Sequence, residues 1–225
     1  MIYTTPYMPP TVVVDLVIFR LHNDTLEVLL VKRSEEPFKG RWSLPGGYSA
    51  AGSTTLQTLA SVAIRKVGIS IHSQLTHLEQ LYTFDTVADD PRGHCVSVTY
   101  MGCGREITPG VGTEHASFHP VKNLPTLAYD HAAVIAYAHN RLIAKLLYTT
   151  VVSSLLPQRF TLRSLQRAYE IILDKKIDKR NFRKKFLSLN LIRETNKTAR
   201  EGAHRPAKLF TFTSKSLTVL ARSLY

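Results

Sequence analysis

The sequence lacks the usual features of a secreted or membrane-bound protein. It contains only two cysteines, Cys95 and Cys103, which cannot build a disulfide framework. No apolar run approaches the roughly 20 residues that span a bilayer. The first ten residues, MIYTTPYMPP, lack the basic and apolar regions of a secretory signal. We therefore expect a cytoplasmic protein with no membrane partner, in which both cysteines are buried thiols rather than redox or metal-binding groups.

Acidic residues are scarce in only one part of the chain. Met1 to Leu156 contain 12 basic and 12 acidic residues, whereas Pro157 to Tyr225 contain 17 basic and 5 acidic residues. The formal net charge of +12 therefore lies entirely in the last third of the 225 residues. A neutral body followed by a basic unit predicts two domains, 1–150 and 151–225, and a polyanionic partner for the second.

The first 150 residues predict a mixed domain of strands and helices. β-Branched runs alternate with segments of helical spacing. The predicted elements are strands over 11–21, 26–33, 78–84 and 95–104 and helices over 54–67 and 130–147. The first two strands form a hairpin, and the turn-rich segment 34–52 is long enough to be functional.

The last third has the element order of a winged helix-turn-helix. Thr161 is the predicted N-cap of a helix that reaches Leu173, and Asp178 is the N-cap of a basic helix. Two short strands follow over 191–197 and 208–213. Ser214 is predicted to cap a last short helix.

The basic helix begins with the residues KRNFRKK, 179–185. Phe182 and Phe186 define its buried face, so the basic side chains point outward. Asparagine and arginine can read adenine and guanine, and lysines suit phosphate. The candidate DNA contacts are Thr161, Lys179, Arg180, Asn181, Arg183, Lys184, His204, Arg205 and Lys208. The alternative is a solvated basic face without a ligand.

The segment from Leu44 to Ile69 resembles a Nudix box. The family pattern G-x5-E-x7-R-E-U-x-E-E-x-G-U, in which U is a bulky aliphatic residue, fits from Gly47 without a gap. The four glutamate positions, however, hold Ser53, Val62, Arg65 and Lys66, and the arginine position holds Ser61. In the family these glutamates bind magnesium and activate water against a pyrophosphate. Because hard cations require carboxylate oxygens, we expect no metal site, no catalytic residues and no enzymatic activity.

Six segments in order resemble the Nudix-related transcriptional regulators of NAD metabolism in bacteria. They are FKGRWSLPGG, LYTFDTVADDPRGHCVSVTY, LPTLAYDHA, FTLRSLQRAYEIIL, DKRNFRKKF and HRPAKLF. The resemblance implies an α+β protein with a Nudix-like α/β/α sandwich domain and a C-terminal winged helix domain. It further implies a homodimeric repressor of NAD-biosynthesis genes that binds double-stranded operator DNA and is released by ADP-ribose or a related nucleotide.

A site for such a nucleotide requires donors for its phosphates and an aromatic face for its base. The candidate effector contacts are Arg33, Arg41, Gly46, Gly47, Arg65, Lys66, Phe84 and Arg92. The two glycines admit close backbone approach, but structural turn glycines would look the same. Arg65 and Lys66 either replace the metal charge or only complement the helix C-terminal dipole. For Phe84, as for Trp42 and Tyr82, core packing is the alternative to stacking.

Two rival functions remain open at this stage. The first is a working Nudix hydrolase of ADP-ribose, or of a related nucleoside diphosphate derivative, with a nucleic-acid-binding tail. The lost glutamates argue against it. The second is an RNA-associated Nudix-like protein, which would prefer single strands, whereas the winged-helix order favours duplex DNA.

Overall fold

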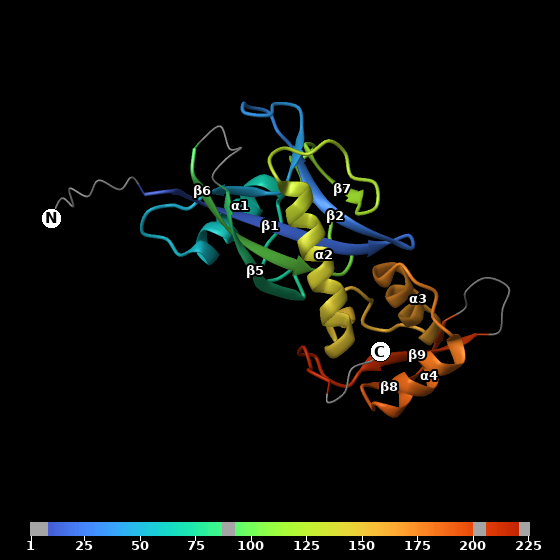
Figure 1. The fold of residues 1–225 in the computed structure, drawn as a ribbon. Helices are drawn as coiled ribbons and strands as arrows, with labels where there is room; N and C mark the ends of the chain where they lie inside the picture. The colour runs from blue at the N-terminus through green and yellow to red at the C-terminus, as the bar shows by residue number, and fades with distance from the viewer. Residues whose placement is uncertain (1–8, 87–92, 200–205, 221–225) are drawn as a thin grey trace.

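Figure 1 shows the computed structural model of the chain, which describes residues 9–86, 93–199 and 206–220. A mixed sheet forms the body, and a smaller C-terminal unit packs beyond the end of helix α2 (Figure 1). The body contains β1 Thr11–His22, β2 Thr25–Lys32, β3 Trp42–Ser43, β4 Gly46–Tyr48, α1 Thr55–Val67, β5 His77–Thr86, β6 Cys95–Cys103, β7 Ala116–Pro120 and α2 His131–Tyr148. The smaller unit contains the 3-10 helix η1 Val151–Ser154, α3 Leu162–Leu173, α4 Lys179–Ser188, β8 Ile192–Ala199 and β9 Ala207–Phe212. No helix in the described part of the chain is long and apolar enough to cross a membrane.

The sheet has seven strands, with the order β3-β2-β1-β6-β5, while β4 pairs with β1 and β7 pairs with β2. β1 and β6 run parallel, and the other pairs are antiparallel. The predicted β1–β2 hairpin is confirmed. Its turn residues Asn23 and Asp24 have φ angles of 45° and 57°, the positive values that a tight two-residue hairpin turn requires.

The two faces of the sheet are covered by different helices. Val14, Leu16 and Ile18 of β1 lie in one buried cluster with residues of α1, whereas Val17 and Phe19 lie in a second cluster with residues of α2. This alternation is the period-two pattern of a strand buried on both faces. The predicted α/β/α sandwich is therefore confirmed.

Local sequence signals account for the ends of α1. The Thr54 hydroxyl accepts from the Gln57 backbone, and Gln57 reaches back to the Thr54 backbone, which completes a capping box. Gly68 ends the helix with a φ of 64°.

The two cysteines are free and buried, as predicted, and burial raises the pKa of the Cys103 thiol to about 12.

The smaller unit is built on an aromatic core. Tyr169 of α3 is fully buried, and its ring centroid lies 5.5 Å from that of Phe182 and 5.7 Å from that of Phe186. The same apolar cluster continues without a break to Leu142 and Leu146 of α2. The body and the smaller unit therefore share one hydrophobic core.

The short helix predicted after Ser214 is wrong, because residues 213–220 form no helix. The Ser216 N–H donates to the Ser214 hydroxyl at 3.1 Å and closes a turn. The chain then returns to the end of α2, where Leu220 N–H donates to the Tyr148 carbonyl at 2.7 Å. Pairing with the body satisfies these backbone groups in place of a helix.

Candidate functional sites

The segment Leu44 to Gly47 lies directly against β1 and α1. A Cβ atom on Gly46 would lie 2.0 Å from the Asp15 carboxylate, and one on Gly47 would lie 3.0 Å from Val62. The same position on Gly47 is 3.6 Å from the Arg65 guanidinium. Both glycines are therefore required for close packing, and this packing brings the β4 backbone next to Arg65.

Three cations gather at the end of α1. Lys66 is half-buried, and its pKa is lowered by burial and by the charges of Arg33 and Arg65, with partial compensation from Asp15 and Glu35. Here the surroundings disfavour the ammonium, so the described residues compensate the positive charge only in part.

A largely buried polar network, which was not predicted from the sequence, packs against the segment from Leu44 to Gly47. The Ser97 hydroxyl donates to the Asp15 carboxylate at 2.5 Å, and the His131 Nε2 lies 3.9 Å from the other Asp15 oxygen. His131 Nδ1 accepts from the Leu44 backbone N–H at 2.9 Å. A lone aspartate within the apolar run VVVDLVIF was the available signal.

The remaining glutamate and arginine positions of the Nudix pattern do not lie together. Ser53 and Ser61 are exposed, and Val62 belongs to the apolar cluster under α1. Within residues 9–86, 93–199 and 206–220, no group of three or more His, Cys, Asp or Glu side chains is arranged to hold a metal ion.

The structure separates the other candidate effector contacts. Arg33 Nε donates to the Pro37 carbonyl at 2.7 Å, and the Arg41 guanidinium lies 5.2 Å from the Phe38 ring centre, so both arginines lie against the loop that they flank. Phe84 packs on the α2 side of the sheet, whereas Arg65 and Lys66 belong to α1 on the other side. Arg92 lies outside the described residues.

The candidate aromatic residues have packing partners. The Trp42 ring centre lies 4.4 Å from that of His119, and Trp42 packs against the α2-side cluster. Tyr82 and Phe84 form a group with Tyr137 of α2, with ring centres 5.3–5.5 Å apart. This group remains partly open to solvent, because Tyr82 is 52% exposed.

The basic helix α4 has the geometry predicted for it. Asp178 accepts the Asn181 backbone N–H at 2.8 Å and caps the helix. Phe182 and Phe186 are buried, while Lys179, Arg180, Asn181 and Lys184 are exposed. Arg183 differs from them, since it is half-buried and its Nε has no hydrogen-bond partner in the described part of the chain.

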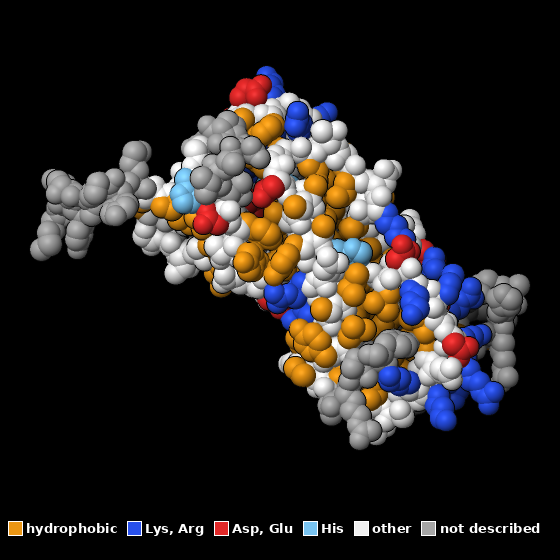
Figure 2. All heavy atoms as spheres, in the orientation of Figure 1, with side chains coloured by type: hydrophobic (Ala, Val, Ile, Leu, Met, Phe, Trp, Pro, Cys, Tyr) orange, Lys and Arg blue, Asp and Glu red, His pale blue; other side chains and the backbone are white. Residues whose placement is uncertain are grey.

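The remaining candidate DNA contacts are distributed unequally. Thr161 is 3% exposed and its hydroxyl caps α3, so its side chain faces the protein rather than solvent. Lys208 is exposed and pairs with Glu194 across the hairpin at 2.8 Å. His204 and Arg205 lie outside the described residues. Lys and Arg side chains gather on the outer surface of the smaller unit, away from the body (Figure 2).

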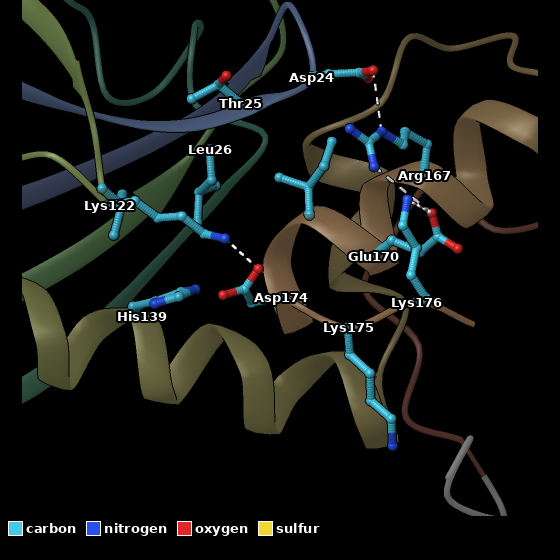
Figure 3. Close-up of a pocket in the computed structure, with 12 residues that line it drawn as sticks. Asp24, Thr25, Leu26, Lys122, His139, Arg167, Glu170, Asp174, Lys175 and Lys176 are labelled. Atoms are coloured by element: carbon cyan, nitrogen blue, oxygen red, sulfur yellow. Dashed lines mark hydrogen bonds and ion pairs between the residues drawn. The ribbon is translucent and has the colours of Figure 1, made fainter.

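A crevice of about 280 Å³ separates the body from α3 (Figure 3). Asp24 at the tip of the β1–β2 turn accepts from Arg167 Nε at 3.1 Å, and Lys122 pairs with Asp174. Beside them, His139 of α2 contacts the Ile172 carbonyl at 3.0 Å. Two ion pairs and one hydrogen bond therefore join the two units across this crevice.

Comparison with known proteins gives a consistent assignment for both parts of the chain. A model of the NUDIX domain matches residues 9–138, and a model of the NrtR DNA-binding winged helix domain matches residues 152–212. The chain is 33% identical over 212 residues to the ADPR responsive transcriptional repressor NtrR of Acinetobacter baylyi, a match that covers 92% of this chain and 83% of that protein. It is also 32% identical over 132 residues to an ADP-ribose pyrophosphatase of Methanocaldococcus jannaschii, covering 57% of this chain and 73% of the enzyme.

One solved structure of a further relative resembles nearly the whole chain, and another resembles its NUDIX part. Shewanella oneidensis NrtR complexed with a 27mer DNA superposes with a TM-score of 0.82 at 30% identity, covering 95% of this chain and 99% of the other. The NUDIX domain of the same protein, complexed with ADP ribose, gives a TM-score of 0.55 at 29% identity and covers 62% of this chain and 94% of that domain.

Proposed function

Because the chain belongs to the NrtR family of NUDIX proteins with a DNA-binding winged helix domain, we propose that it is an ADP-ribose-responsive transcriptional repressor. The main support for this function is that the same segment matches the winged helix model and contains the excess of positive charge. The NrtR winged helix match covers residues 152–212, and the whole charge excess of the chain begins at residue 157. Double-stranded operator DNA is the partner of this unit, and genes of NAD metabolism are its targets.

The recognition helix of this repressor is α4. Its exposed N-terminal turn presents Lys179, Arg180 and Asn181, the end of a recognition helix that contacts bases in the major groove. Asn181 and Arg180 supply base contacts, and Lys179 and Lys184 supply phosphate contacts. Arg183 adds a contact from the flank of α4 and Lys208 adds one from β9, with His204 and Arg205 as further contacts outside the described residues, whereas Thr161 acts by capping α3.

The effector site lies at the end of α1. The half-buried Lys66 and the exposed Arg65, with Arg33, meet the diphosphate of ADP-ribose at a place where the protein compensates the charge of Lys66 only in part. The backbone of Gly46 and Gly47 borders the same place, and Arg41 and Arg92 bind the remainder of the nucleotide. Phe84 packs on the α2 side of the sheet and is therefore excluded from this site. The cations take the position of the lost metal glutamates, so binding requires no magnesium.

This assignment separates the repressor from the hydrolase that the pyrophosphatase relative represents. Hydrolysis requires a metal-activated water, and Ser53, Val62, Arg65 and Lys66 supply no carboxylate for the metal. We therefore infer that ADP-ribose is bound and not cleaved. Incubation with ADP-ribose and magnesium, followed by quantification of AMP, tests this inference, since steady AMP production would favour the hydrolase.

Recognition of a near-palindromic operator requires two copies of the chain. A homodimer places two α4 helices about 34 Å apart, which is one turn of DNA. The mass in solution, measured by light scattering with and without DNA, tests this arrangement. A monomer in both states would contradict it.

The decisive experiment is a DNA shift assay on the upstream region of the neighbouring genes, with increasing ADP-ribose and with EDTA or magnesium. We expect a specific duplex complex that ADP-ribose dissolves equally well in both buffers. A preference for single-stranded RNA would favour an RNA-associated protein, and release only in magnesium would contradict charge replacement by Arg65 and Lys66.

A further inference from the structure

A second and larger cavity lies where the body meets the smaller unit. Its volume is about 440 Å³, within the range of small-molecule sites. On the body side it is bordered by the start of β5 and by Arg105 after β6, and η1, which connects the body to the smaller unit, lies next to them. On the other side it is bordered by the start of β8 and by the segment that follows β9.

The charges on the wall of this cavity are of one sign. The cations Arg105, Arg193 and Lys215 line it together with the His77 imidazole, and no aspartate or glutamate does. Among the described residues, neither Arg193 nor Lys215 makes an ion pair. The crevice beside α3 is different, because its Lys122 and Arg167 are neutralised by acidic partners.

Two groups on the body side are held at the cavity wall. Arg105 donates through both Nε and Nη2 to the Ser153 carbonyl, at 3.1 and 2.8 Å, which fixes its guanidinium. His77 Nε2 is buried and makes no hydrogen bond within the described part of the chain; it lies 3.5 Å from the Glu79 carboxylate. That carboxylate is itself paired with Lys145 at 2.6 Å, so its charge is compensated on the side of α2.

We propose that this cavity binds a small phosphate-bearing anion at a site separate from that at the end of α1. Phosphate oxygens would accept from the Arg193 and Lys215 side chains of one unit and from Arg105 and His77 of the other. Thr211 lines the same wall, and its hydroxyl serves as a further donor, whereas the Thr213 and Ser214 hydroxyls already donate to the Leu191 and Ser216 carbonyls. An anion held in this way crosslinks the two units and favours one arrangement of the winged helix unit relative to the body.

The position of the cavity argues against a DNA phosphate as the occupant. Arg193 pairs with Thr211 near the start of the β8–β9 pair, whereas β8 ends at Ala199. Six strand residues separate the two ends, a distance of about 20 Å at roughly 3.3 Å per residue. Arg193 therefore lies at the opposite end of the strand pair from Ala199.

Calorimetric titration of the full chain with inorganic diphosphate tests the proposal. The background variant carries Arg65→Gln and Lys66→Gln, which removes the first anion site. Diphosphate binding should remain in this background and weaken by about tenfold for each charge removed when Arg193→Gln and Lys215→Gln are added. Lys175→Gln with Lys176→Gln is the matched control, since it removes the same charge at the other crevice and should leave the affinity within twofold.

Two results would overturn the proposal. One is the absence of diphosphate binding in the Arg65→Gln/Lys66→Gln background at millimolar concentration while circular dichroism shows a folded protein. The other is loss of DNA affinity in the Arg193→Gln/Lys215→Gln variant with unchanged diphosphate binding, which would assign these cations to the DNA backbone.

Discussion

The chain carries two groups of cations that differ in their surroundings. At the end of α1, Lys66 is half-buried and its pKa is lowered by burial and by the neighbouring Arg33 and Arg65 charges. On α4, Lys179 and Lys184 are exposed around a helix whose buried side is Phe182 and Phe186. In the first group, a partly desolvated Lys66 lies beside two other cations, whereas the second group is spread over a surface.

This difference matches two kinds of anion. A partly desolvated charge interacts strongly with one oppositely charged group at close range, as a small nucleotide provides. Exposed charges gain little from any single partner, but together they neutralise a polyanion and release its counterions. The same residue types therefore serve a small effector in the body and a long nucleic acid in the smaller unit.

The largest expected effect concerns whether the body and the smaller unit unfold together or separately. Phe182→Ala removes a fully buried ring that contacts Tyr169, and we expect the free energy of unfolding to fall by about 3–5 kcal/mol. Because one apolar cluster runs from α2 into α3 and α4, urea unfolding followed by circular dichroism should still show a single transition.

The control for this experiment is Val111→Ala, because Val111 is fully exposed and its loss should change stability by less than about 0.5 kcal/mol. Two separate transitions, of which only one moves in Phe182→Ala, would show that the body and the smaller unit are independent domains despite their shared core.

The sequence predicted the two regions with unequal success, and the particular residues explain why. Thr161 and Asp178 are local signals, and each is at the helix boundary predicted from it. The last helix failed because the pairing of Leu220 with Tyr148 joins residues 72 positions apart. Such long-range contacts leave no local pattern.

The candidate sites follow the same rule. The exposed face of α4 is set by spacing within one helix, so the sequence predicted the exposure of Lys179, Arg180 and Lys184, although Arg183 is half-buried. The effector site depends on which face of the sheet each element covers, and sequence spacing could not show that Phe84 lies on the α2 side, away from Arg65. Likewise, Asp15 and His131 meet only through the fold.

The second prediction tests the difference between the two groups of cations through the salt dependence of DNA binding. Lys179→Gln with Lys184→Gln removes two exposed phosphate contacts, so the slope of log K against log salt for DNA binding should fall by about 1.8. DNA affinity at low salt should drop by roughly tenfold or more, whereas ADP-ribose affinity should not change. Fluorescence anisotropy at several salt concentrations measures the slope, with Lys32→Gln, an exposed lysine of the body, as the control. An unchanged slope would remove α4 from the DNA interface.

The third prediction concerns the pH dependence of effector binding. Because its pKa is lowered, protonated Lys66 is less stable in the free protein than an ordinary lysine would be. This energetic cost disappears as the pH rises from the lowered pKa toward 10.5, because Lys66 then loses its proton. A bound diphosphate stabilises the ammonium and raises its pKa, so affinity should fall as pH rises through the free-state pKa of Lys66, by up to about tenfold per pH unit.

Calorimetry at about pH 9 in two buffers of different ionisation heat should detect the linked proton uptake. Lys66→Arg is the matched variant, because arginine keeps its charge at every accessible pH. It should bind ADP-ribose without proton uptake. Equal proton uptake in both proteins would place the titrating group elsewhere.

The smallest expected effect is at the crevice that joins the two regions. Arg167 pairs with Asp24 at 3.1 Å, and both side chains are substantially exposed, at 40% and 65%, so the pair contributes no more than about 1 kcal/mol. Coupling between two binding sites is typically about 1–3 kcal/mol, which makes even this contact large enough to influence how ADP-ribose binding affects DNA affinity. A double-mutant cycle with Asp24→Asn and Arg167→Gln, measured as DNA affinity with and without ADP-ribose, isolates the pair. We expect each single variant to change the ratio of the two affinities by up to about fivefold and the double variant to add nothing further. Strictly additive effects would show that the two residues act separately and that the shared core alone connects the regions.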